Sequence, residues 1–189
     1  ITHMRGYLNE QILIYHIKRG HTESFAPLYD YYVQKVYRFV YLKVPSASDA
    51  EDLTSETFLK TWQYIKESKG IGNLQAVIYK IARNVVVDFY RKRGKALVES
   101  LDDSENEIVI ADRVDLTLEE KMTLKSDMVL VEKALRELKD TYREIIVLHF
   151  LNDLSLKEIA KVVDRSPGAV RVMLHRGIKA LKGKLKPHK

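Results

Sequence analysis

Cationic and hydrogen-bonding side chains gather near the carboxyl end of the chain, in the stretch Leu154–Leu181. Ser155, with Glu158 three residues later, forms a capping box that predicts the start of a short helix. Ser166 and then Pro167 predict the start of a second helix after a tight turn. Two helices joined in this way form a helix-turn-helix, whose second helix lies in the major groove of DNA. The alternative is a surface helical hairpin whose lysines are only solvated.

The second of these predicted helices has two chemically different sides. Its apolar side, expected to face the rest of the fold, carries Val170, Leu174, Ile178 and Leu181. Its other side carries cations that can hold phosphates and contact base edges. The residues expected to contact duplex DNA are Arg165, Ser166, Ala169, Arg171, Val172, His175, Arg176 and Lys179.

A second cationic cluster lies on a helix predicted over residues 73–93. One of its faces is apolar, with Leu74, Ile78, Ile81, Val85 and Phe89. The opposite face carries Lys80, Arg83, Asn84, Val87, Tyr90 and Arg91. Cations can hold phosphates, an amide can read a base edge, and an aromatic ring can stack on an unpaired base. Arg93 extends the charge beyond this face. A solvated basic helix is the alternative.

The charge of the chain is unevenly distributed. The 189 residues carry a net charge of +6, yet the segment Lys95–Lys121 has nine acidic residues against three basic ones and so carries −6. The rest of the chain therefore carries +12. Two basic parts joined by an acidic connector favour a nucleic-acid partner more strongly than the net charge alone does.

The composition also indicates the cellular compartment in which the protein works. The chain has no cysteine, which excludes disulfides and thiolate zinc sites and is typical of a reducing cytoplasm. No apolar run is as long as a membrane span, and we recognise no signal peptide, so we expect a cytoplasmic protein without membrane insertion. The residues Ile1–Met4 look like a vector remnant ahead of a start methionine and are left out of the interpretation.

No group of side chains has the spacing of a catalytic or metal site. The six histidines are scattered, and no two have ligand spacing on one helix. Asp102, Asp103 and Glu105 are acidic neighbours, but no histidine, glycine-rich loop or nucleophile accompanies them. We therefore expect no enzymatic activity, no cofactor and no metal.

The predicted fold is all-α, with two small helical domains joined by an acidic flexible linker. The domains are expected at residues 5–94 and 127–186, with the linker at 95–126. Residues 107–111 in the linker are the one candidate for a short strand. Four helices are predicted in the first domain. The first covers residues 9–18, and the second starts at a cap at Thr22. The third runs from a capping box of Ser48 and Glu51 to a break that begins at Ser68, and the fourth covers residues 73–93. Helices in the second domain are predicted over residues 126–138, 140–150, 155–163 and 167–184. In the helix over 140–150, Asp140 is the expected N-cap, and the residues expected to be buried are Tyr142, Ile145, Ile146 and Phe150.

The order of these features resembles the extracytoplasmic-function (ECF) sigma factors, small subunits that give bacterial RNA polymerase its promoter specificity. The segment DAEDLTSETFLKTWQYI, at Asp49–Ile65, is similar to a family pattern that contains AEDL and a later tryptophan. Three further blocks are similar to family segments and follow the family order: Phe25–Tyr41, Leu74–Arg93 and Leu135–Leu185.

The resemblance implies a role for each part. The first domain would bind core polymerase, at the clamp helices of the largest subunit, through Asp49, Asp52, Leu53, Glu56 and Phe58. It would also melt and read the minus-ten promoter element, capturing a flipped base in the loop Ser68–Asn73, through Ser68, Lys69, Asn73, Lys80, Arg83, Asn84, Tyr90, Arg91 and Arg93.

The resemblance assigns the helix-turn-helix residues given above to the minus-thirty-five element. It further implies contact with the flap of the second-largest polymerase subunit and restraint by an anti-sigma factor. The rival interpretation is a helix-turn-helix regulator of transcription that does not bind core polymerase. That interpretation leaves the segment at Asp49–Ile65 unexplained.

Overall fold

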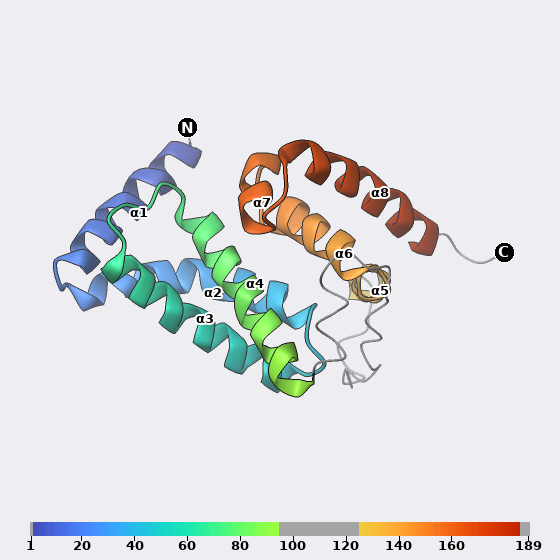
Figure 1. The fold of residues 1–189 in the computed structure, drawn as a ribbon, viewed down its shortest axis with the longest axis horizontal. Coiled ribbons are helices and arrows are strands. Elements are labelled where there is room, and N and C mark those ends of the chain that lie inside the picture. The colour runs from blue at the N-terminus through green and yellow to red at the C-terminus, as the bar shows by residue number, and fades with distance from the viewer. Residues whose placement is uncertain (1, 95–124, 186–189) are drawn as a thin grey trace.

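The computed structural model describes residues 2–94 and 125–185, and every regular element in these ranges is helical (Figure 1). The first group, here called the first module, contains α1 (Thr2–Lys18), a short turn (Thr22–Phe25), α2 (Ala26–Tyr41), α3 (Ala47–Glu67) and α4 (Leu74–Arg93). The second module contains α5 (Lys125–Arg136), α6 (Asp140–Ile146), a wide turn (Val147–Leu151), α7 (Leu156–Val162) and α8 (Pro167–Leu185). This confirms the predicted all-α fold with two helical domains. The strand expected at 107–111 lies outside the described residues.

Two helices of the first module do not start at the cap residues that the sequence predicted. Ser46, not Ser48, is the N-cap of α3, and its hydroxyl accepts a hydrogen bond from the backbone N–H of Asp49 at 3.1 Å. Ser46 follows Pro45 and has the extended backbone that a cap requires, so α3 starts two residues earlier than predicted. Thr22 likewise caps no α-helix, because it begins a short 3₁₀ turn that leads into α2.

The buried threonines of α3 show how this helix tolerates polar residues in the core. The hydroxyls of Thr54, Thr57 and Thr61 each donate to the carbonyl four residues earlier, at 2.6, 2.7 and 2.8 Å. The helix backbone therefore satisfies these groups, and their methyl groups are left to pack. Together with buried Ile65 they form the inner side of α3.

Helix α4 is buried over a wider arc than the single apolar face that we predicted. Leu74, Ile78 and Val85 are buried as expected, but Tyr79 and Tyr90 are buried too. The reason is that α4 packs on α3 and also on α2, where Tyr79 meets the ring of Phe39 and Tyr90 donates to the carbonyl of Lys43 in the loop after α2. It packs in addition on α7 of the second module. In Figure 1 it lies between the two groups of helices. One face is therefore core and the other is an interface between modules.

The second module contains the predicted helix-turn-helix. Ser155 and Glu158 form the capping box of α7, each side chain accepting from the other residue's backbone N–H. Asp164, with φ of 52°, turns the chain after α7. The hydroxyl of Ser166 then accepts from the N–H of Ala169 at 3.2 Å, and Pro167 is the first residue of α8. Both predicted helix starts are confirmed.

The helix predicted over residues 140–150 differs from the observed one at both ends. Lys139, not Asp140, is its cap residue, and Asp140 directs its carboxylate elsewhere. After Ile146 the helix widens into a π-type turn at Val147–Leu151. This wider turn changes the helical phase, so Phe150, predicted to be buried, is 57% exposed.

Packing of α8 on α6 depends on the small size of Gly177. A Cβ at this position would lie 3.1 Å from Cδ1 of Ile146 and 3.2 Å from Cβ of Tyr142. We expect Gly177→Val to lower the free energy of unfolding by about 1–3 kcal/mol, because the helices would have to move apart. Gly183 is the matched control, since nothing lies within 4 Å of its position and Gly183→Ala should raise stability by up to about 1 kcal/mol. Thermal or urea unfolding measures both, and equal effects would contradict the close packing.

Candidate nucleic-acid interface

The outer side of α8 is a cationic surface open to solvent. Arg171, His175, Arg176 and Lys179 are all exposed, as is Val172 between them. The opposite side of α8 is anchored in the module through buried Val170 and Leu174. Because the anchored side fixes the helix, its cations project in one direction, as a groove-reading helix requires.

The residues before this surface form the turn of the helix-turn-helix. Arg165 and Ser166 are exposed, and Ala169 is partly buried. The hydroxyl of Ser166 already serves as the helix cap. The structure thus brings the predicted duplex-binding residues together on one end and one side of α8.

Three predicted minus-ten residues contact the second module. Lys80 Nζ lies 2.6 Å from Oδ1 of Asp164, and Arg83 Nε lies 3.5 Å from Oε1 of Glu144. The amide of Asn73 donates to Oε1 of Glu158 at 2.5 Å while its own oxygen caps α4. Each of these groups therefore meets a carboxylate of the other module.

The other predicted minus-ten residues are spread over the surface near α4. Asn84 and Arg91 are exposed on the helix, and Lys69 is exposed in the preceding loop. Ser68 is partly buried, and its carbonyl accepts from Lys18 Nζ at 2.6 Å. Arg93 is exposed, lies over the ring of Phe89 and donates to Asp49 at 3.1 Å.

Tyr90 does not present a free ring in this arrangement. It is buried, and its hydroxyl donates to the carbonyl of Lys43 at 2.7 Å. Burial raises the pKa of its phenol to about 12, with the nearby carboxylate of Asp140 adding to the shift. The expectation that Tyr90 stacks on an unpaired base does not fit a side chain held in this way.

The predicted polymerase-binding residues of α3 divide into a surface set and a core set. Asp52 is exposed, Glu56 is partly exposed and paired with Lys60 at 2.8 Å, and Asp49 lies in the first turn. Leu53 and Phe58 are buried, at 6% and 4% exposure, so they pack the core and offer no surface to a partner. Direct contact of these two side chains with polymerase stays a prediction, and their burial does not favour it.

A further residue extends this surface, and the sequence analysis missed it. Leu59 is 66% exposed, although it is a large apolar side chain. It follows Asp52 by seven residues and Glu56 by three, so all three share one side of α3. Acidic and apolar groups thus occur together on the outside of this helix. The helical spacing from the two acidic residues was a signal that could have identified Leu59.

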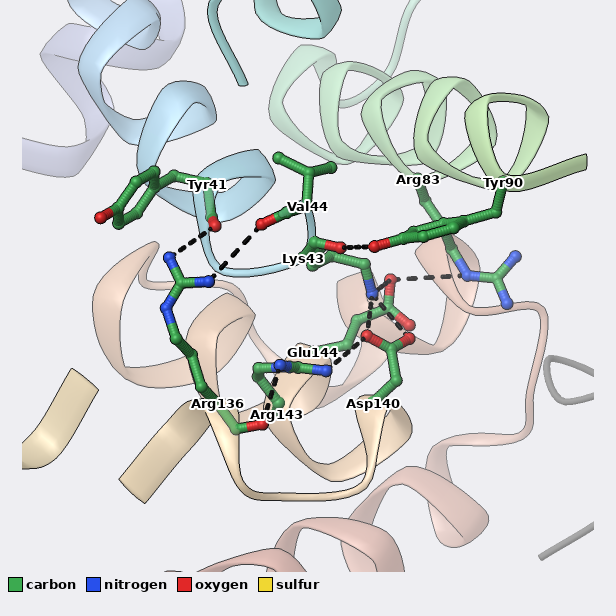
Figure 2. A network of polar contacts seen from close by, with 9 residues as sticks. All are labelled: Tyr41, Lys43, Val44, Arg83, Tyr90, Arg136, Asp140, Arg143 and Glu144. Carbon is green, nitrogen blue, oxygen red and sulfur yellow. Dashed lines mark hydrogen bonds and ion pairs between the residues drawn. The ribbon is translucent and has the colours of Figure 1, made fainter. Parts of the chain in front are cut away.

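The polar network in Figure 2 joins the modules at the loop between α2 and α3. Lys43 is only 6% exposed, and its ammonium group lies 2.9 and 2.8 Å from the two carboxylate oxygens of Asp140. It also lies 3.5 Å from Oε1 of Glu144. Arg143 supports the same carboxylate of Asp140 from inside the second module at 3.3 Å. This network had no signal in the sequence.

Arg136 completes the junction with hydrogen bonds to the backbone of the first module. Its guanidinium donates to the carbonyl of Tyr41 at 2.9 Å and to that of Val44 at 3.5 Å, and it lies over the ring of Tyr41. These carbonyls belong to the end of α2 and the loop after it, which have no helical partner of their own. The second module thus caps a helix of the first.

The charges around Asp140 determine its ionisation. Burial acts to raise the pKa of its carboxyl group, but the ammonium of Lys43 and the guanidinium of Arg143 outweigh this effect and hold the pKa below the ordinary value of 3.8. The carboxylate is therefore charged throughout the neutral range and stays paired with Lys43.

Comparisons with known proteins agree with this architecture. The family model for sigma-70 region 2 matches residues 28–96, and that for sigma-70 region 4 matches residues 128–181. The chain is 31% identical over 170 residues to the ECF RNA polymerase sigma factor BldN of Streptomyces coelicolor, covering 89% of this chain and 63% of that protein. It is 28% identical over 176 residues to the ECF RNA polymerase sigma factor SigW of Bacillus subtilis, covering 90% of this chain and 93% of that protein.

Two solved structures share the fold. CnrH in complex with the cytosolic domain of CnrY has a TM-score of 0.69 at 20% identity, covering 94% of this chain and 97% of that chain. The sigma factor RpoE of Bartonella quintana, in complex with the anti-sigma factor NepR, has a TM-score of 0.68 at 22% identity, covering 88% of this chain and 99% of that chain.

The two family models lie on the two modules and together match well over half of the chain. The chain therefore belongs to the sigma-70 family, in its ECF group. Its function is that of the family: it associates with RNA polymerase, recognises promoter DNA and promotes transcription initiation. Sigma factors are initiation factors and not catalysts. Within residues 2–94 and 125–185 no helix is long and apolar enough to cross a membrane, and no cluster of side chains suited to a metal occurs.

The pairing of Asp140 makes a prediction about pH. Because the pKa of this carboxyl is lower in the folded chain than its ordinary 3.8, its contribution to stability is complete above that value and is lost as the pH falls through the folded pKa. We expect Asp140→Asn to lower the free energy of unfolding at pH 7 by up to about 3 kcal/mol. The difference from wild type should shrink below about pH 4. Unfolding measured from pH 7 to pH 2 tests this, with the exposed Asp30→Asn as control. A constant difference across the range would contradict the assignment.

Proposed function

We propose that the two modules act at separate points of the transcription initiation complex. The first module binds the clamp helices of the largest polymerase subunit through α3 and engages the minus-ten element through α4 and the loop before it. The second module contacts the flap of the second-largest subunit and reads the minus-thirty-five element through α8. The exposed cationic side of α8, at the end of a correctly capped helix-turn-helix, carries this proposal.

The minus-thirty-five assignment rests on the chemistry of that side. Arg171 and Arg176 offer forked donors that suit guanine edges or phosphates, and Lys179 offers a phosphate contact. Val172 is 48% exposed, and its apolar side chain can meet a thymine methyl group. The helix is anchored on its opposite side, so these groups enter one groove together.

The minus-ten assignment requires a strand that has left the duplex. Capturing one unstacked base costs a few kcal/mol, which stacking and base-edge hydrogen bonds offset. The loop residues Ser68 and Lys69, followed by Asn73, would receive the base, and Asn84 would supply an amide on the helix below. Lys80, Arg83, Arg91 and Arg93 would hold the strand's phosphates.

The polymerase-binding assignment rests on the outer side of α3. Asp49, Asp52 and Glu56 supply carboxylates, and exposed Leu59 supplies the apolar contact that buried Leu53 and Phe58 do not offer. We place this encounter in the cytoplasm, where the polymerase acts.

An anti-sigma factor is a further proposed partner. The RpoE structure that shares this fold is a complex with an anti-sigma factor, and that of CnrH is a complex with a cytosolic domain of CnrY. A chain with the same two-module fold offers similar helical surfaces to such a partner. Co-purification of the chain with proteins from its own host is the direct way to identify it.

The polymerase contact is tested on α3. We expect Asp52→Lys and Leu59→Asp each to weaken binding to core RNA polymerase about tenfold or more, because each puts an unfavourable group at the centre of the interface. Pull-down and titration at low salt, followed by promoter transcription in vitro, measure the effect. Glu67→Lys, an equal charge change at the exposed end of the same helix, should leave binding unchanged. A wild-type chain that does not bind core polymerase would refute the proposed function.

The duplex contact is tested on α8. Arg171→Ala and Arg176→Ala should each weaken binding of upstream promoter duplex by about 1–3 kcal/mol and reduce the steepness of its salt dependence. Lys182→Ala is the matched control, because Lys182 is exposed near the end of α8 and outside the proposed contact. Unchanged affinity for both arginine variants across a range of salt concentrations would refute the groove assignment.

A further inference from the structure

We propose that α1 positions the loop between α3 and α4 for strand capture, with Gln11 and Lys18 as positioning residues that act through the loop backbone. The residues of this loop, 68–73, are those that the proposed function assigns to an unstacked base, so the inference rests on that function. Helix α1 precedes the residues that the sigma-70 region 2 model matches, which begin at residue 28. The inference gives this helix a task in promoter melting.

Two side chains of α1 hold the backbone of the loop. The ammonium group of Lys18 donates to the carbonyl of Ser68 at 2.6 Å, and the amide of Gln11 donates to the carbonyl of Ile71 at 3.1 Å. The loop accordingly runs alongside α1 in Figure 1. The side chain of Ile71 is only 7% exposed, so this point of the loop is also held by packing. Both ends of the segment 68–71 are therefore fixed by groups outside the loop.

The spacing of the two donors matches the length of the segment that they hold. Gln11 and Lys18 are seven positions apart, so they lie on one side of α1 and about 10.5 Å apart along its axis. Ser68 and Ile71 are three positions apart, and a chain of that length spans at most about 10–11 Å when extended. Ser68 has an extended backbone, with ψ of 142°. The segment thus lies antiparallel to α1 and is held at both ends in a stretched conformation.

A helix can position a loop only if the helix itself is fixed. The side of α1 between the two donors packs in the core of the first module, because Ile14 and Ile17 are 4% and 1% exposed. Near its other end, Glu10 accepts a hydrogen bond from the phenol of Tyr32 on α2 at 2.5 Å. The donors of Gln11 and Lys18 therefore project from a helix whose place is set by the core and by α2.

The middle of the loop stays open to a ligand. Lys69 and Gly70 are exposed between the two held carbonyls, and the loop ends at Asn73, whose side chain starts α4. A loop that is ordered before a base arrives loses less conformational entropy when the base binds. Without the two donors, only a fraction of the chains would hold the receiving conformation, and the apparent affinity for the strand would fall by that fraction.

The test removes each donor and keeps the length of its side chain. Lys18→Met and Gln11→Leu are assembled with core RNA polymerase and given non-template oligonucleotides in which each minus-ten position carries each of the four bases. We expect each variant to bind the preferred strand about three- to tenfold more weakly and to discriminate less between bases. The fluorescence change of 2-aminopurine beside the captured base should fall in parallel. Binding of core polymerase and of minus-thirty-five duplex should be unchanged, which a merely structural role of the two contacts does not predict.

Matched variants separate positioning from charge and from folding. Lys18→Arg keeps a charged donor and should restore capture to within about twofold of wild type. Arg19→Met removes the neighbouring exposed cation, which lies over the ring of Tyr15, and Gln34→Leu removes an exposed amide on α2. Both should capture the strand as wild type does. Circular dichroism verifies that every variant is helical, and if Lys18→Met does not fold, Gln11→Leu decides the matter.

Several outcomes would overturn the positioning role. They are unchanged capture and base preference in both donor variants, an equal loss of core polymerase binding, and an equal loss of capture in Arg19→Met. Failure of the proposed function looks different, because the wild-type holoenzyme would then capture no minus-ten strand. Capture by wild type with a clear base preference that both donor variants share refutes this inference alone.

Discussion

The position of one buried ammonium group governs the arrangement of this molecule. Lys43 has almost no contact with solvent, and a lysine so placed is tolerated only where carboxylates compensate its charge. Both compensating groups, Asp140 and Glu144, come from the other module. The first module alone would leave Lys43 hydrated, and the second alone would leave two carboxylates hydrated. The junction therefore exchanges solvent for opposite charge, and such an exchange has a small net free energy. The modules are joined by an interaction that can be reversed.

The cationic side chains of the two modules are placed in different surroundings. Those on the outer side of α8 are exposed, and buried Val170 and Leu174 fix that helix within its own module. On α4, Lys80 and Arg83 pair with Asp164 and Glu144 of the second module. The junction between the modules therefore changes the surroundings of α4 and leaves those of the outer side of α8 unchanged.

Short-range chemistry made much of this structure predictable. The caps at Ser155 and Ser166, the break after α3 and the start of α4 at Asn73 all follow from residues within one helical turn. The family resemblance supplied the functional class. Two kinds of feature escaped prediction. Neighbouring apolar residues on α3 could not be divided from sequence into core and surface, so Phe58 was assigned to the surface and Leu59 was overlooked. The pairing of Lys43 with Asp140 spans 97 positions, and no local pattern indicates which distant charge a lysine will meet.

Glu158 has a double attachment with a consequence for how this chain can change over generations. One of its carboxylate oxygens accepts from the backbone of Ser155 and so helps to start α7, while the other accepts from Asn73, the cap of α4. A mutation at this codon cannot loosen the union of the modules without also weakening the start of the helix-turn-helix. Lys43 and Arg136 take no part in starting a helix, so a mutation at either position can alter the union of the modules and leave the caps of the helix-turn-helix intact.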